Sequence, residues 1–301
     1  MQVIDMETYL PGPSNDTPHP GQDLPGPPGP DRLPPPPDYG FAHYDTIFTR
    51  PGANELTAAA PMSTVERADE LVRLMDRAGV VKGLLSTSQN AVTVEAIKRH
   101  PSRLVGICHL SPYDGMRAVR ELERLVKEDN IRGISVASLY DMVPASDRRY
   151  YPIYAKCVEL DIPVRIYTAM TYASDRPYEL GHPRHLDQVA MDFPELTIIA
   201  GLAGWPWVSD MVGLLRRHAN LCCDTAAHRP RHFATPGSGW EQFLQFGNTL
   251  LQDKITVGLS WTLLGMSMEE VIEEYLALPL KDSVKEKWLY GNAARILNLG
   301  E

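Results

Sequence analysis

The amino-acid sequence predicts an α/β fold: a single (β/α)8 TIM barrel over residues 1–301, with a proline-rich insertion after its first strand. Strand-like apolar runs alternate with helical patterns along most of the chain. There are eight such runs, the number that closes a barrel of parallel strands. The length of 301 residues and the hydrophobic content of 44% also allow one large core, and barrels of this type are commonly about this size.

The first predicted strand, residues 3–6, is followed by an insertion at residues 11–61. Twelve prolines lie between Pro11 and Pro37, a composition that favours extended polyproline conformations over helices and central strands. Ordinary connections have about 4 to 6 residues, so this one is far longer than usual. Its second half carries large apolar side chains, namely Tyr39, Phe41, Tyr44, Ile47 and Phe48. The insertion is interpreted as a lid or an oligomer-contact arm, with a flexible linker as the alternative.

The rest of the chain alternates helix and strand. Ser63 and Glu66 have the spacing of a capping box, and Leu71 and Met75 then share one face of the helix that follows. Further strands are predicted at residues 81–86, 104–109, 131–136, 163–168, 196–200, 221–224 and 255–259. Helices between them are predicted at residues 115–127, 154–160, 185–192, 208–218 and 268–278. In such a barrel, reactive residues lie where the strands end and the βα loops begin.

Composition argues against several classes of partner. A net charge of −9, without a run of Lys and Arg, does not suit a nucleic-acid groove. No stretch approaches the roughly 18 apolar residues of a membrane span, and the N-terminus lacks a signal-peptide pattern. The cysteines, which have neither zinc-knuckle nor disulfide-framework spacing, are Cys108, Cys157, Cys222 and Cys223. We expect a cytoplasmic homo-oligomer, a dimer, that binds a small-molecule substrate.

Three motifs together resemble those of a known family. They are LTIIAGLAGWPW at residues 196–207, YGNAAR at residues 290–295 and GHP at residues 181–183. The sequence resembles the amidohydrolase-related branch of the amidohydrolase superfamily, which contains aminocarboxymuconate-semialdehyde decarboxylase and the resorcylate decarboxylases. The resemblance covers almost the whole chain outside the insertion. It implies a barrel of carboxy-lyase or hydrolase ancestry.

The chain departs from this family at the metal-binding positions. The family usually carries Asp-x-His-x-His on strand one, a His on strands five and six, and an Asp on strand eight. The corresponding ligand positions here hold Glu7, Tyr9, Tyr167, Leu202 and Ser260. Zinc needs about three or four nitrogen, thiolate or carboxylate donors, and only Glu7 is an ordinary ligand. The comparison implies no catalytic metal and no cofactor, so that chemistry would depend on side-chain acids, bases and hydrogen-bond donors.

The first and fifth strands provide the main candidates. Alternation along strand one puts Asp5, Glu7 and Tyr9 on one face, which in this family points into the barrel, and the same parity puts Arg165 and Tyr167 inside. Glu7, Tyr9 and Tyr167 are candidate proton-transfer groups, or alternatively a hydrogen-bonded plug that fills the vacated cavity. Arg165 is predicted to face Asp5 or Glu7, because an unpaired buried arginine is costly.

Other strand ends provide further candidates. His109 ends strand three and is a candidate proton shuttle, since imidazole titrates near neutrality; a structural role is the alternative. Asp224 ends strand seven and is expected to organise its loop more than to catalyse. The candidate substrate-binding residues are Arg165, Trp205, Asp224, His228, Ser260 and Trp261.

The leading hypothesis is a metal-independent enzyme of lyase, hydrolase or cyclase type. Its substrate would be a small organic acid, a phenol or a polyketide-like ring, and Glu7 would transfer protons. The second hypothesis is an inert barrel that binds a ligand or a partner protein. The third is a zinc enzyme with substitute ligands, His109, His228 and Asp224.

Overall fold

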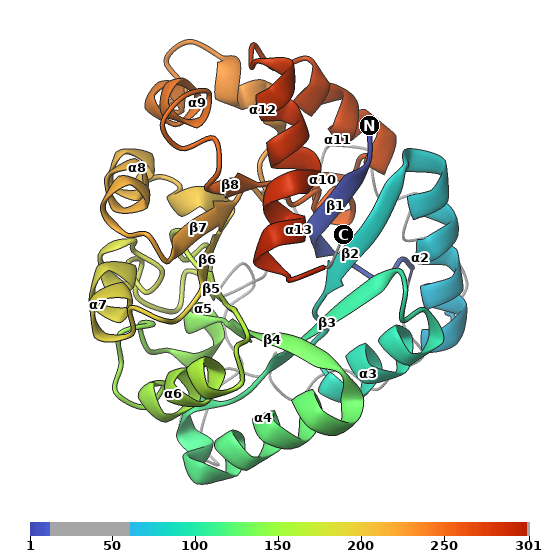
Figure 1. Ribbon diagram of the computed structural model, residues 1–301, viewed down its shortest axis with the longest axis vertical. Coiled ribbons are helices and arrows are strands. Elements are labelled where there is room, and N and C mark those ends of the chain that lie inside the picture. The colour runs from blue at the N-terminus through green and yellow to red at the C-terminus, as the bar shows by residue number, and fades with distance from the viewer. Residues whose placement is uncertain (13–60, 300–301) are drawn as a thin grey trace.

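The computed structural model describes residues 1–12 and 61–299, and the fold is a (β/α)8 barrel (Figure 1). Eight parallel strands pair in chain order: β1 (Val3–Thr8), β2 (Val80–Leu85), β3 (Leu104–His109), β4 (Ile131–Val136), β5 (Val164–Tyr167), β6 (Ile198–Gly201), β7 (Leu221–Asp224) and β8 (Ile255–Thr256). Met6 N donates to Val257 O at 2.9 Å, which links β1 to the segment after β8. Most of the predicted proline-rich insertion, residues 13–60, lies outside the described residues.

Helices surround the strands in Figure 1. The longer ones are α2 (Thr64–Ala78), α3 (Asn90–Arg99), α4 (Met116–Asp129), α6 (Tyr151–Glu159), α7 (Arg184–Asp192), α8 (Val208–Arg217), α9 (Glu241–Gly247) and α11 (Met268–Leu276). The short ones are η2 (Pro112–Asp114), α5 (Ser138–Asp141), η3 (Leu202–Gly204), η4 (Pro230–Ala234), α10 (Trp261–Leu264), α12 (Asp282–Glu286), η5 (Lys287–Gly291) and α13 (Asn292–Ile296). None of the helices described is long and apolar enough to cross a membrane.

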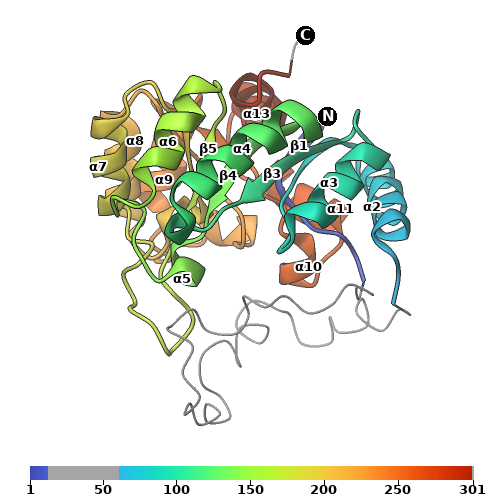
Figure 2. The same cartoon turned by 90° about the horizontal axis from the view of Figure 1, so that it is seen from below.

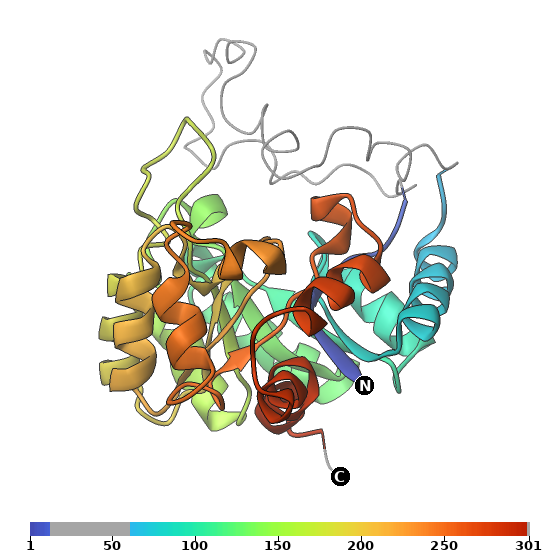
Figure 3. The same ribbon diagram turned by 90° about the horizontal axis from the view of Figure 1, so that it is seen from above.

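The two ends of the barrel differ. Figure 2 shows α13 at one end, near the start of β1, and shows α5 and α10 at the other. Figure 3 gives the same arrangement from the opposite side. Because α5 follows β4 and α10 follows β8, their end is the one where the strands finish. This carboxyl end, which we call the mouth, is where barrel enzymes carry their active sites.

The start of α2 shows how local sequence determines an element. Ser63 Oγ accepts from Glu66 N, and Glu66 Oε2 accepts from Ser63 N, so the predicted capping box is confirmed. Gly79, with φ of 72°, ends the helix in the left-handed conformation that glycine adopts without strain. The helix buries Ala68, Leu71 and Met75 against the barrel.

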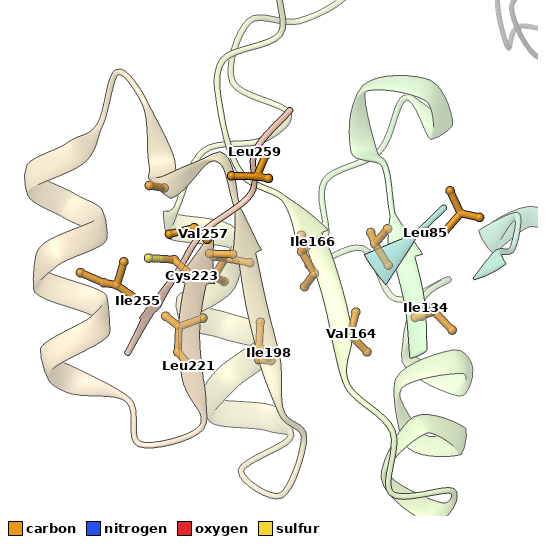
Figure 4. Close-up of a cluster of buried hydrophobic side chains, with 14 of the residues drawn as sticks. Leu85, Ile134, Val164, Ile166, Ile198, Leu221, Cys223, Ile255, Val257 and Leu259 are labelled. Carbon is orange, nitrogen blue, oxygen red and sulfur yellow. The ribbon is translucent and has the colours of Figure 1, made fainter. Parts of the chain in front are cut away.

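Alternation along the strands separates two apolar layers. Figure 4 shows side chains of the outer layer between strands and helices, including Val164, Ile198 and Leu221. The inner layer fills the barrel and is closed by the α13 region: Ile4, Met6, Leu84, Val105, Ile107, Ile199, Cys222, Ala293, Ile296 and Leu297. The inner layer is apolar below the mouth, so the polar interior residues gather at the mouth.

Candidate functional site

Four polar side chains meet at the mouth: Glu7, Arg165, Asp224 and Ser260. Arg165 donates from Nε to Asp224 Oδ2 at 2.6 Å and from Nη2 to Asp224 Oδ1 at 3.1 Å. The same Nη2 lies 3.1 Å from Glu7 Oε1, and Ser260 Oγ donates to Glu7 Oε2 at 2.5 Å. We call these four residues the Arg165 network. It joins β1, β5, β7 and the turn after β8 through one guanidinium.

Of the two carboxylates predicted to face Arg165, Asp5 and Glu7, only Glu7 pairs with it, and Asp224 is a second partner. Burial by itself lowers the pKa of Arg165, but the charges of Asp224 and Glu7 outweigh burial and raise that pKa above its usual value. Gly201 gives the guanidinium room, because a Cβ at this position would lie 3.1 Å from Arg165 Cζ. The network keeps a permanent positive charge inside the barrel, next to a carboxylate that is 17% exposed.

Asp224 supports the network from behind. Its side chain is fully buried, and besides Arg165 it accepts hydrogen bonds from Leu202 N and Ala226 N, both at 3.1 Å. These bonds tie the loops after β6 and β7 to the guanidinium. The geometry suits the loop-organising role predicted for Asp224 better than contact with a substrate.

Asp5 corrects one prediction from strand alternation. Its neighbours Ile4 and Met6 pack in the inner layer, so Asp5 lies on the opposite face of β1. The register of β1 against β2 shifts between Asp5 and Thr8, and this irregularity returns Glu7 to the interior. Asp5 Oδ1 accepts from Leu259 N at 2.7 Å and from Glu7 N at 3.0 Å. Burial raises the pKa of Asp5 to about 7.

A second polar cluster is formed by His109 at the end of β3 and by Asp141 and Tyr150, which follow β4. His109 Nδ1 lies 3.1 Å from Ser135 O, and His109 Nε2 lies 3.5 Å from Asp141 Oδ1. Tyr150 Oη donates to Asp141 Oδ2 at 2.6 Å. We call His109, Asp141 and Tyr150 the His109 network. Strand register places His109, Ser135 and Arg165 in one interior row, so the two networks face the same mouth.

The two candidate tyrosines differ in what they contact. Tyr167 Oη donates to Met170 O at 2.7 Å, so this hydroxyl already holds the loop after β5. Tyr9 is half-buried and lies near enough to Arg165 to affect its pKa.

Aromatic side chains line the loops after β5, β6 and β7. The ring of Trp205 is parallel to that of Tyr172, with centroids 6.3 Å apart, and lies 5.9 Å from the ring of His228. His228 in turn contacts Trp240 at 5.0 Å. Burial lowers the pKa of His228 to about 4, so this ring is neutral at physiological pH.

The last two predicted substrate-binding residues are buried. Ser260 has no exposed surface, and besides donating to Glu7 it accepts from Ala227 N at 2.8 Å. Trp261 is 4% exposed. Ser260 thus holds Glu7 in place and joins the two βα loops that follow β7 and β8.

Sequence reasoning missed Asp141, Tyr150 and Gly201. Asp141 and Tyr150 belong to the segment after β4, where α5 is too short to give a helical pattern. Gly201 lies within a motif that was noted for its family resemblance alone. The sequence did contain a signal for Gly201, because a glycine on the strand next to that of an interior arginine leaves room for the guanidinium.

Among residues 1–12 and 61–299, no group of three or more His, Cys, Asp or Glu side chains is arranged to hold a metal ion. The substitute zinc ligands considered from the sequence, His109, His228 and Asp224, therefore do not form such a group. Asp224 is instead paired with Arg165.

A barrel of eight parallel strands in chain order, with a polar cluster at the carboxyl end, makes the chain a TIM-barrel protein. The family model described as amidohydrolase matches residues 50–299, and the chain belongs to this family. A comparison with curated proteins finds no match.

Three solved structures share the fold. An uncharacterised TIM-barrel protein from Bordetella bronchiseptica is 23% identical, with 99% of each chain covered and a TM-score of 0.70. The 4-oxalomesaconate hydratase from Rhodopseudomonas palustris is 19% identical, with 99% of this chain and 96% of that chain covered and a TM-score of 0.61. A 5-carboxyvanillate decarboxylase from Novosphingobium aromaticivorans, a D314N mutant with bound manganese and a nitrobenzoic acid, is 17% identical; coverage is 80% of this chain and 86% of that chain, and the TM-score is 0.59.

Proposed function

We propose that this chain is a metal-independent amidohydrolase-fold enzyme, of lyase or hydrolase type, that acts on a small organic acid or phenol. The observation that carries the proposal is the Arg165 network, in which a guanidinium and a partly exposed glutamate occupy the mouth of the barrel. The related hydratase and decarboxylase, named for organic acids, support this substrate class. Fold kinship by itself does not choose among decarboxylation, hydration, hydrolysis and cyclisation.

A divalent metal does not fit the donors at this site. Both carboxylates of the Arg165 network already pair with a guanidinium, whose positive charge repels a cation. The remaining groups nearest the former ligand positions are the tyrosines and Ser260, which are poor ligands unless deprotonated. In this proposal the guanidinium supplies the positive charge that a metal supplies in the manganese-bound relative.

Glu7 is the group proposed to move the proton. Because Arg165 and Ser260 both donate to it, Glu7 is held in one orientation with part of its surface open to the mouth. A carboxylate fixed in this way can accept a proton from a substrate or from water. Tyr9 and Trp205, both partly exposed, are the proposed contacts for the substrate.

The test combines a substrate panel with one substitution. Aromatic and small organic acids are incubated with the protein in the presence of a chelator, and products are followed by mass spectrometry. Glu7→Gln keeps the shape of the side chain, and turnover should fall by about 10²- to 10⁴-fold, the usual contribution of a positioned acid or base. Glu121→Gln, on the surface of α4, is the matched control and should keep full activity. Undiminished turnover in Glu7→Gln would reject the proposed role of Glu7.

The second candidate function is a ligand-binding barrel without catalysis. It is favoured by one observation: each oxygen of Glu7 already has a donor, so the Arg165 network satisfies itself. This function predicts compounds that raise the melting temperature of the protein without being converted.

A further inference from the structure

We infer that Asp141 holds His109 as an imidazolium, and that His109 binds the carboxylate of an organic-acid substrate at the mouth. This inference rests on the proposed function for the substrate class. It assigns the substrate anchor to the His109 network, whereas the proposed proton-transfer group, Glu7, belongs to the Arg165 network. Asp141 is then a positioning residue, because it acts through His109.

Both nitrogens of the His109 ring face acceptors. Ser135 O carries no proton, so His109 Nδ1, 3.1 Å away, is a donor. His109 Nε2 faces the carboxylate of Asp141 at 3.5 Å, within ion-pair distance. A neutral imidazole has only one N–H. Its other nitrogen would carry a lone pair, and that lone pair would face an acceptor. The imidazolium form satisfies both contacts.

Asp141 contacts His109 through one carboxyl oxygen and Tyr150 through the other. Tyr150 is fully buried, and burial, followed by the charge of Asp141, raises the pKa of this phenol far above its usual value. Tyr150 therefore remains protonated and donates to Asp141 Oδ2. With Oδ2 accepting from Tyr150 and Oδ1 facing His109, the arrangement suits a carboxylate. Asp141 is buried, so water does little to screen the charge of its carboxylate.

Contacts from several elements hold His109 and Asp141 in position. Asn90, the first residue of α3, donates from Nδ2 to His109 O at 2.8 Å and accepts from His109 N at 2.9 Å through Oδ1. Tyr113 Oη donates to Asp141 O at 2.9 Å. Both the backbone of His109 and the residue that faces its ring are thus fixed before any ligand binds.

His109 is also open to the mouth, because its side chain is 31% exposed, whereas that of Asp141 is 8% exposed. Since both N–H groups of the imidazolium already face acceptors, it is the charge of the ring that attracts the carboxylate of a ligand. Burial lowers the pKa of His109, but the interaction with Asp141, its charge and the Ser135 carbonyl outweigh burial and raise that pKa above its usual value. Arg165 lies in the same interior row, where its charge is paired with Glu7 and Asp224.

The test is a histidine NMR titration of the full-length protein, in which His109→Gln identifies the His109 signal. The pKa of His109 should lie above about 6.5, and Asp141→Asn should lower it by about 1 to 2 units, since the paired negative charge is lost. Tyr150→Phe should raise it, because the phenol no longer shares the charge of Asp141. Asp69→Asn is the matched control: it removes the carboxylate from His100 on the outer surface and should leave His109 unchanged.

Benzoate then serves as the probe for the anion site, with uncharged benzamide as its control. Benzoate should shift the His109 signal, and at pH 7 it should bind about tenfold more weakly to Asp141→Asn, whereas benzamide should show no such difference. Equal benzoate binding by wild type and Asp141→Asn, or an unchanged pKa of His109 in that variant, would overturn the inference. If Asp141→Asn does not fold, an unchanged or lower pKa in Tyr150→Phe overturns it instead. The titration needs no turnover, so its outcome is independent of the Glu7→Gln result.

Discussion

Asp5 and Glu7 lie two residues apart on the same strand, yet their carboxyl groups are in opposite electrostatic environments. Asp5 is fully buried, its carboxylate accepts from two backbone N–H groups and pairs with no cation among the described residues, and burial raises its pKa to about 7. Glu7 is partly open to the mouth and pairs with the guanidinium of Arg165. The partners that the fold brings to each carboxyl group thus determine its environment, and the position of the residue in the sequence does not.

Asp5 and Glu7 also differ in their roles. Asp5 joins β1 to the segment after β8 through Leu259, and its contacts are those of a structural residue. Glu7 keeps part of its surface exposed, and its contacts hold it in one orientation. Substitutions in and around these two residues should test this difference in role.

The largest effect is expected when Arg165 is removed. Arg165→Met leaves Glu7 and the fully buried Asp224 without their shared cation, and the free energy of unfolding should fall by about 3 to 5 kcal/mol at pH 7. Denaturant unfolding measures the change. Arg117→Met, which removes an exposed ion pair with Asp114, should cost less than about 1 kcal/mol. Equal losses in the two variants would mean that the Arg165 network contributes no more than a surface pair.

The second effect is a pH dependence that originates in Asp5. Its pKa rises from 3.8 in the unfolded chain to about 7 in the fold, so its contribution to stability is complete below pH 3.8 and is lost as the pH rises towards 7. Asp5→Asn keeps the oxygen that accepts from Leu259 and removes the ionisation. The variant should be more stable than wild type at pH 8, by up to about 4 kcal/mol, and the difference should shrink towards pH 4.

Asp282→Asn, at a 95% exposed side chain, is the control for this titration and should follow the wild-type pH profile. Unfolding free energies measured at several pH values from 4 to 8 give the comparison. A wild-type profile that Asp5→Asn leaves unchanged would show that Asp5 is already ionised without cost in the fold.

The smallest effect is expected at Gly201. Gly201→Ala places a Cβ about 3.1 Å from Arg165 Cζ and Nη2, so the guanidinium must shift away from Asp224. A loss of about 1 to 3 kcal/mol in unfolding free energy is expected, as for other overpacked interior positions. Gly213→Ala, where an added Cβ meets no atom within 4 Å, should be neutral or stabilising. Equal stability of Gly201→Ala and wild type would show that the guanidinium moves freely.

The strands could be predicted because each carries its own pattern. The predicted strand at residues 104–109 coincides with β3, and the one at residues 131–136 coincides with β4. Helix α3 was not predicted, and its first turn has neither a side-chain cap nor an acidic residue. Periodicity thus identified most elements and missed those whose stability depends on packing.

The candidate site was predictable only in part. Alternation correctly placed Arg165 inside, and the cost of an unpaired charge predicted Asp5 or Glu7 as its partner, of which the structure has Glu7. Alternation failed at Asp5, because it takes no account of the irregular register between β1 and β2. The contact between His109 and Asp141 also escaped prediction, since it joins two βα loops 32 residues apart in the sequence.

The claim that a guanidinium replaces the metal at this mouth is tested most directly by elemental analysis of the purified protein. After mild chelation, the account predicts less than about 0.1 equivalent of zinc, manganese or iron per chain, and added metal should not raise any turnover found. Near one equivalent retained in wild type, and lost in Glu7→Gln, would contradict the account, because it would show that Glu7 holds a metal and does not depend on Arg165 for its positive partner.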